Sequence, residues 1–482
     1  MKIKSLVVFI LCLMHLTGCA GMKDIFTYAK AVDPNALEAS KVIKEADISG
    51  FWPSEEWWKA YGDPQLDALI QRSFAESPTL KIAIDRLHLS QAFTENLHAQ
   101  TMPSVNADAS VINEKFTSLQ FIPPPYAGNA EWNNKVTISL AYDLDLWGQK
   151  SSLWKGAINE SQASFLDAQK VKLELVKAIV QSYVQLSMAF AIRDVEEERI
   201  SVIKQRVSIL RRELSAGLST HMVLNEVEAE LPLANAKRDK IDEYIAVLKN
   251  QLAALTGQGS GAGEQIVRPS ISLQTAVSLP SQLPANLVGR RPDIVAYRWR
   301  IEAAKENIKS AKADFYPNIN LISFIGFQAL GFSQLLSNSA AIGGVGPAFS
   351  LPIFDGGRRR SNLAAKTTQY DIAVDSYNVT LINAFQEISD QLVILKSNGS
   401  QKSQVQAALS LTQKSYGSAE IGYNAGLENY QYMLKLKSVM LDDQELLARL
   451  DAKRLEAYAS LMSALGGGVL APNDSQAAIL NP

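Results

Sequence analysis

The residues best placed to undergo chemistry in this sequence lie near its amino terminus. Residues 16–19 read Leu-Thr-Gly-Cys and end an eleven-residue apolar run that begins at Leu6, behind Lys2 and Lys4. This run is too short to cross a bilayer as a helix, and its length suits the core of a signal peptide. A cysteine behind small residues resembles a bacterial lipobox, in which the thiol receives diacylglycerol. We therefore predict that residues 1–18 are removed and that Cys19 is acylated; the alternative is an ordinary signal peptide with an incidental cysteine.

The residue after the predicted acylation site favours the outer membrane. Ala20 stands where an aspartate would favour retention at the inner membrane. Cys12 is the only other cysteine, and it lies within the predicted signal peptide. The mature chain therefore has no second thiol with which to form a disulfide. No cofactor is expected beyond the covalent diacylglycerol and N-acyl chain on Cys19.

Catalytic and metal-binding patterns are not recognisable elsewhere in the sequence. The histidines of the mature chain, His88, His98 and His221, lack metal-site spacing, and no Gly-x-Ser-x-Gly elbow occurs. The glycine-rich residues 257–263 lack the Lys-Ser/Thr of a phosphate-binding loop, so they are typical of a linker. A formal net charge of -2 gives no reason to expect a nucleic-acid partner. We therefore expect neither an enzyme nor a metal site.

Four stretches show the two-residue period of half-buried strands. In residues 136–146, large apolar side chains share one face, and polar or small side chains share the other. Residues 104–112 alternate in the same way, whereas residues 318–327 and 345–354 alternate less regularly. The sequence therefore predicts sheet segments with one apolar face.

Long helices are predicted between these strands. Residues 157–216 contain no glycine or proline, and a helix of that length would extend roughly 90 Å. A second helix is predicted near 221–255. No run of eighteen apolar residues follows the signal peptide, so any membrane-spanning part of the mature chain must consist of strands.

The pattern occurs twice, with a period near 210 residues. The helix breaks Ala216-Gly217 and Ala425-Gly426 differ by 209 positions, and the helix ends at Gly257 and Gly467 differ by 210. Such a period is too long for a solenoid repeat and indicates a duplicated helix-strand-strand-helix-helix unit. The expected organisation is a signal peptide (1–18), an N-terminal anchor segment (19–52), a first repeat (53–257), a linker (258–284), a second repeat (285–467) and a C-terminal tail (468–482).

Four strands per chain constrain the architecture. Small closed barrels need about eight strands, and an open sheet edge in lipid costs several kcal/mol per unpaired backbone group. Several chains must therefore pool their strands if the sheet lies in the membrane. The long helices exceed the ~30 Å hydrocarbon thickness and must project into the periplasm.

These motifs together resemble one known family. The stretches WWKAYGDPQLDALI, YDLDLWGQ, GRRPDIVAYRWRIEAAKENI, ADFYPNINL and LPIFDGGRRRSNL are similar to those of the outer membrane factors, the TolC- and OprM-like (NodT-type) efflux lipoproteins. The resemblance covers nearly all of the mature chain. It implies a mainly α fold with a membrane β-barrel: a homotrimer with a twelve-stranded barrel, a long periplasmic α-helical barrel and an equatorial collar.

The resemblance also implies a function and partners. It implies a passive exit duct, lipid-anchored in the outer membrane and extending into the periplasm. Its substrates would come from an inner-membrane pump, such as an RND-type transporter, through a periplasmic adaptor (membrane fusion protein). The alternative is a periplasmic coiled-coil adaptor or scaffold lipoprotein. Such an adaptor would carry one helical hairpin between β-rich halves, whereas this sequence duplicates the helical unit. The sequence leaves the exported cargo open.

Two short motifs are expected where return strands become tunnel helices. Trp147 and Gly148 follow the second strand, and Asp355, Gly356 and Gly357 follow the fourth. The glycines permit a tight backbone path. We interpret the arginines at 358–360 as a basic cluster that faces solvent or lipid headgroups, and a selectivity role in the tunnel is the alternative.

The periplasmic tips, residues 214–224 and 423–437, are the expected functional ends. Glu428, Gln431, Tyr432 and Lys435 follow helical spacing and are expected to share one face. An ordinary solvated face is one reading. The resemblance implies a gate at which three copies converge. Lys435 stands where relatives commonly carry aspartate, which puts an acidic, cation-binding constriction in doubt.

Overall fold

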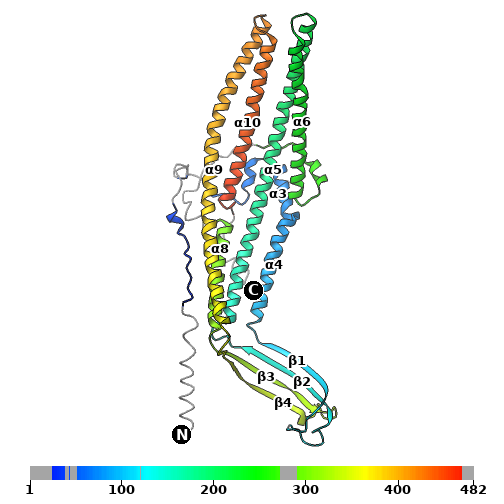
Figure 1. Cartoon of the computed structure of the whole chain (residues 1–482), viewed down its shortest axis with the longest axis vertical. Helices are drawn as coiled ribbons and strands as arrows, with labels where there is room; N and C mark the ends of the chain where they lie inside the picture. The colour runs from blue at the N-terminus through cyan, green and yellow to red at the C-terminus, as the bar shows by residue number, and fades with distance from the viewer. Residues whose placement is uncertain (1–23, 38–42, 44–51, 120, 272–289, 469–482) are drawn as a thin grey trace. The chain divides into compact units, whose positions relative to one another are not determined.

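The computed structural model describes residues 24–37, 43, 52–119, 121–271 and 290–468 (Figure 1). Its two halves repeat one order of elements, and the matching long helices have equal lengths of 67 and 35 residues. The first half comprises α3 (Pro64–Glu76), α4 (Pro78–Ala99), β1 (Ser104–Lys115), β2 (Ala130–Asp143), α5 (Gln149–Ser215) and α6 (His221–Leu255). The second comprises α8 (Pro292–Ala313), β3 (Asn318–Leu330), β4 (Ala341–Ser350), α9 (Arg358–Asn424) and α10 (Tyr430–Ala464).

The described residues form two compact units. The first takes the described residues of 1–31, 87–164 and 297–377, and it contains the sheet. The second takes those of 32–86, 165–296 and 378–482, and it contains the helical hairpins. The helices α5 and α9 each begin in the first unit and continue into the second.

The sheet of the first unit is antiparallel throughout, in the order β1-β2-β3-β4 (Figure 1). Its register aligns apolar side chains on one face, as the pairs Ala107↔Ile138 and Ile138↔Ile325 show. This apolar face is exposed in the single chain, with Val345 at 78% and Ile325 at 69% of full exposure. Exposing an apolar surface of this kind to water is unfavourable, so the face is suited to contact with lipid.

Two strands end earlier than the sequence pattern predicts. β2 ends at Asp143 rather than at residue 146, and β4 ends at Ser350 rather than at residue 354. At Asp145 the backbone turns to a positive φ of 41°, and the carboxylate of this residue caps the next helix. As a result α5 begins at Gln149, eight residues before the predicted start.

The helical hairpins of the second unit are joined by apolar contacts along α5. One cluster packs α5 against α6 through Ile203, Val207 and Leu224. Another packs α5 against α10 through Val202 and Leu434. One window of α5 is apolar and long enough to cross a membrane by composition, but 56% of it is buried inside the protein, as in the core helix of a soluble domain.

Two glycines at equivalent positions of the halves allow close backbone approach. Gly257 and Gly466 follow α6 and α10, both with positive φ. A Cβ atom on Gly257 would lie 2.5 Å from the carbonyl oxygen of Glu76, and one on Gly466 would lie 2.5 Å from that of Arg290. In each half, the end of the return helix therefore lies against backbone near the start of the same half, and a glycine permits this close approach.

Candidate functional site: the strand-to-helix turns and the helix tips

The first strand-to-helix turn is fixed by a capping carboxylate and an aromatic pair. Asp145 accepts hydrogen bonds from the backbone N–H groups of Lys150 (3.0 Å) and Ser151 (2.8 Å) at the start of α5. The Trp147 indole donates to the carbonyl oxygen of Pro317 (2.8 Å) and stacks on Tyr316 with ring centroids 4.7 Å apart. The structure thus places Trp147 and Gly148 between β2 and α5, and Gly148 adopts a φ of 72°.

The second turn repeats this capping at the start of α9. Asp355 accepts hydrogen bonds from the backbone N–H groups of Gly357 (3.1 Å) and Arg359 (3.2 Å). Gly356 and Gly357 have φ values of 65° and 89°, which side chains rarely tolerate. Both turns therefore combine a capping aspartate with left-handed backbone.

Arg359 does not face outward as the predicted basic cluster requires. Its guanidinium group lies 2.7 Å from the Asp355 carboxylate and also donates to the carbonyl oxygens of Asp314 (3.2 Å) and Pro352 (2.5 Å). The side chain is only 11% exposed. This arginine is therefore a structural tie within the turn, while Arg358 and Arg360 are exposed.

The two helix tips have the same backbone structure. At the first tip, Leu218 N–H donates to the Glu213 carbonyl oxygen (2.8 Å), and at the second, Leu427 N–H donates to that of Gly422 (2.8 Å). The preceding glycines have φ values of 72° and 73°, which completes a Schellman motif at each tip. Leu218 and Leu427 project from these turns with exposures of 79% and 82%.

The candidate gate residues do not all lie on one helical face. α10 begins at Tyr430 behind its N-cap Asn429, so Glu428 lies in the turn and not on the helix. The prediction that Glu428 shares a face with the others is therefore wrong, because the cap restarts the helix two residues later. Gln431, Tyr432 and Lys435 do lie on α10, and Tyr432 and Lys435 are exposed.

Lys435 makes no ion pair within 4.0 Å among the residues that the structure describes. Glu228 of α6, an acidic residue near the first tip, binds Arg211 at 2.7 Å. The hairpins are linked nearby by Lys437 of α10, which pairs with Glu198 of α5 at 2.5 Å. The ion pairs between the hairpins therefore use residues that the sequence did not single out.

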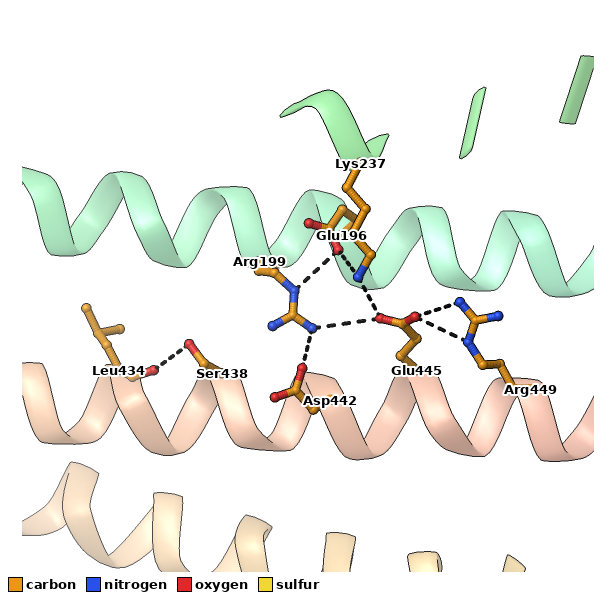
Figure 2. Close-up of polar contacts among 8 residues, drawn as sticks. All are labelled: Glu196, Arg199, Lys237, Leu434, Ser438, Asp442, Glu445 and Arg449. Carbon is orange, nitrogen blue, oxygen red and sulfur yellow. Dashed lines mark hydrogen bonds and ion pairs between the residues drawn. The ribbon is translucent and has the colours of Figure 1, made fainter. Parts of the chain in front are cut away.

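A larger charge network joins three helices further from the tips (Figure 2). Lys237 of α6 lies 3.0 Å from Glu196 of α5 and 2.9 Å from Glu445 of α10. Arg199 of α5 lies 3.3 Å from Glu196 and 2.8 Å from Asp442. Both hairpins therefore share one network, which we call the hairpin clasp and define as Glu196, Arg199, Lys237, Asp442, Glu445 and Arg449.

Within the clasp, the charged forms of Lys237 and Glu445 are stabilised. Burial alone would lower the pKa of Lys237, but hydrogen bonds to Glu445 and Glu196 outweigh burial and raise it above its ordinary 10.5. Burial alone would raise the pKa of Glu445, but hydrogen bonds from Lys237 and Arg449 outweigh burial and lower it below its ordinary 4.5. Both shifts favour the charged forms, so the contact between Lys237 and Glu445 is an ion pair.

Cys19 and the signal peptide lie outside the residues that the structure describes. Within the described part, no three histidine, cysteine or acidic side chains are grouped closely enough to hold a metal ion. The site is thus one of turns, tips and ion pairs between helices.

Comparison with known proteins gives this arrangement a family. The model of the outer membrane efflux protein family matches residues 69–258 and 283–467, one match in each half. The chain belongs to the outer membrane efflux protein family. Members of this family are channel proteins, and this efflux protein is an outer membrane channel that extends into the periplasm.

Individual relatives support the same family. The chain is 37% identical over 353 residues to the fusaric acid resistance protein FusA of Burkholderia cepacia, covering 73% of this chain and 67% of FusA. It is 27% identical to the multidrug resistance outer membrane protein MdtP of Escherichia coli K12, over 94% of both chains. The solved structure of VceC from Vibrio cholerae matches with a TM-score of 0.80 and 30% identity, over 86% of this chain and all of VceC. The predicted fold class, a helical barrel with a membrane β-barrel, is confirmed.

Proposed function

We propose that this efflux protein works as a homotrimer that pools twelve strands into one barrel. The observation that carries the proposal is the four-stranded sheet. In the described residues, β1 and β4 each pair on one side only, and the apolar face is exposed. Three copies would satisfy both edges and present the apolar face to lipid. The trimer would then form a passive exit duct from the periplasm to the outside.

We infer that the tips are where the duct meets a periplasmic adaptor, and that an inner-membrane pump, such as an RND-type transporter, delivers the substrate. Leu218 and Leu427 support this, because two large apolar side chains project from equivalent turns. Exposed apolar side chains at a polar rim are typical of docking sites. As cargo we propose small organic molecules, since the relatives are named for resistance to fusaric acid and to multiple drugs.

We propose that Cys19 carries diacylglycerol and an N-acyl chain and anchors the protein in the outer membrane. The lipobox-like residues 16–19 support this. Cys19→Ala should abolish lipid incorporation and processing, and labelled fatty acid on the variant would refute the proposal. Trimers should still insert, because barrel burial far outweighs one lipid anchor.

We propose that the resting duct is narrow at the tips, with Lys435 near the constriction and the hairpin clasp holding the tips in place. Purified protein in planar bilayers tests this function. We expect discrete channels of low conductance that widen when the clasp is broken. Trimers that insert but conduct in no variant would overturn it.

A further inference from the structure

Three backbone N–H groups hold the N-terminal segment on helix α9. The N–H groups of Tyr28 and Ala29 donate to the Asp371 carboxylate, at 3.0 and 3.2 Å from Tyr28 and 3.1 Å from Ala29. The N–H group of Val32 donates to the Asn378 side-chain oxygen at 2.8 Å. A run of extended backbone is thus bound through its main chain by two polar side chains of one helix.

The spacing of the two acceptors matches the spacing of the donors. Asp371 and Asn378 are seven residues apart, which is two helical turns or about 10.5 Å. Residues 28 to 32 span about 13 Å when extended, and the donors at 29 and 32 lie about 10 Å apart. Sequence numbers rise in the same direction in both, so the segment runs parallel to α9. The backbone donors of the segment are therefore spaced to match the two acceptors on α9.

The aromatic side chains of this segment contribute little packing to the contact, whereas Ala29 and Val32 are half-buried. Tyr28 is 79% exposed, and Phe26 is exposed as well. The extended run ends at Asp33, whose side chain accepts from the backbone N–H of Asn35 (2.9 Å) and caps a 3-10 turn at Pro34–Ala36. The two acceptors on α9 therefore bind the main chain of this segment at both of its ends.

We propose that Asp371 and Asn378 form a docking ladder for residues 28–32 that fixes how far an acylated Cys19 can reach along α9. Nine residues from Cys19 to Tyr28 span at most ~30 Å. The thirteen residues from Arg358, the first residue of α9, to Asp371 span about 20 Å. Cys19 can therefore reach the strand-to-helix turns with about 10 Å to spare. This second half of the proposal rests on the proposed acylation of Cys19.

Hydrogen exchange on the intact trimeric lipoprotein in nanodiscs tests the ladder itself. Asp371→Ala should speed exchange of the Tyr28 and Ala29 amides at least about tenfold, because hydrogen bonds to a charged acceptor are the stronger class. Asp375→Ala, one turn further on α9, is the matched control, since Asp375 is exposed. Asn378→Asp keeps an acceptor oxygen and should preserve protection of Val32, whereas Asn378→Leu should remove it. Equal exchange in Asp371→Ala and the control would overturn the ladder.

A deletion tests the link to the anchor. Removing residues 21–26 leaves three residues from Cys19 to Tyr28, about 10 Å, which is shorter than the ~20 Å of α9 between Asp371 and the strand-to-helix turn. In the acylated protein this deletion should speed exchange of Tyr28 and Ala29 severalfold, and a six-residue Gly/Ser replacement should restore protection. The same deletion behind a cleavable signal peptide without the lipobox cysteine should leave protection intact.

The outcomes separate the two proposals. Mass spectrometry first establishes whether Cys19 is acylated. If it is not, the anchoring proposal is wrong, and the Asp371 and Asn378 variants still decide the ladder. If Cys19 is acylated, and the Tyr28 and Ala29 amides of the deletion variant exchange at equal rates with and without the lipid, the ladder does not limit how far the acylated cysteine reaches. The second half of the proposal is then wrong.

Discussion

Lys237 on α6 and Glu445 on α10 lie 2.9 Å apart, and this ion pair joins the hairpins of the two repeats. Glu445 also binds Arg449 at 2.8 Å, and Lys237 also binds Glu196 at 3.0 Å. The Glu445 side chain is only 15% exposed, so water screens it weakly. The Glu445 carboxylate therefore links the two hairpins by binding one cation on each, Lys237 of α6 and Arg449 of α10.

Removing the charge of Glu445 should loosen the tips. We expect Glu445→Gln to destabilise the resting arrangement by about 1–2 kcal/mol per chain, between the values typical of exposed and buried pairs. In planar bilayers its open probability or conductance should rise. Glu226→Gln is the matched control, since Glu226 is an exposed carboxylate on α6. Unchanged channels in Glu445→Gln would show that the clasp does not restrain the tips.

The clasp should give the tips a defined pH window. The pKa of Glu445 is lowered, so its contribution is present above pH 4.5 and is lost as the pH falls through the bound value. The pKa of Lys237 is raised, so its contribution is present below pH 10.5 and is lost at higher pH. Protection of the amides at the hairpin contacts, corrected for the intrinsic pH dependence of amide exchange, should therefore stay flat between these limits and fall below pH 4.5. In a Glu445→Gln protein, this change below pH 4.5 should be absent. An identical change in that variant would show that another group causes it.

Lys435 should influence the ion selectivity of the pore. Three ammonium groups near one axis repel cations, since rings of like charge set ion preference. Lys435→Asp should shift reversal potentials toward cation selectivity and make the pore blockable by divalent ions. Lys453→Asp, an exposed position of α10 away from the tip, should do neither. If Lys435→Asp matches the parent in conductance, selectivity and divalent block, this lysine belongs to an ordinary solvated face.

The glycine at the end of α10 should be important for folding. Gly466→Ala would place a Cβ atom 2.5 Å from the Arg290 carbonyl oxygen, on a backbone with a φ of 92°. We expect a loss of about 2–4 kcal/mol from strain and overpacking. Gly261→Ala meets nothing within 4 Å and is the control. Denaturant unfolding of the two variants measures the difference, and equal midpoints would contradict the close approach.

The regular features of the fold could be predicted from the sequence. Alternation in residues 136–146 identified β2, and the absence of glycine and proline from residues 157–216 identified most of α5. The end of β2 was predicted three residues too late, because periodicity does not reveal that Asp145 adopts a positive φ and caps α5.

The candidate site was less predictable. Helical spacing placed Glu428 on α10, but the Asn429 cap excludes it from the helix. The hairpin clasp was missed because its partners, such as Lys237 and Glu445, are 208 residues apart. Their pairing depends on the register between α6 and α10, which a single sequence does not specify. The acidic and basic runs on these helices were the only available signal.

We propose that three copies pool their strands into one channel, and native mass spectrometry of the detergent-extracted protein measures this directly. We expect a particle of three chains whose strand content is lost when the trimer dissociates on heating, because four strands cannot close a barrel alone. A compact, folded monomer with full strand content would show that the strands of one chain need no partner copies.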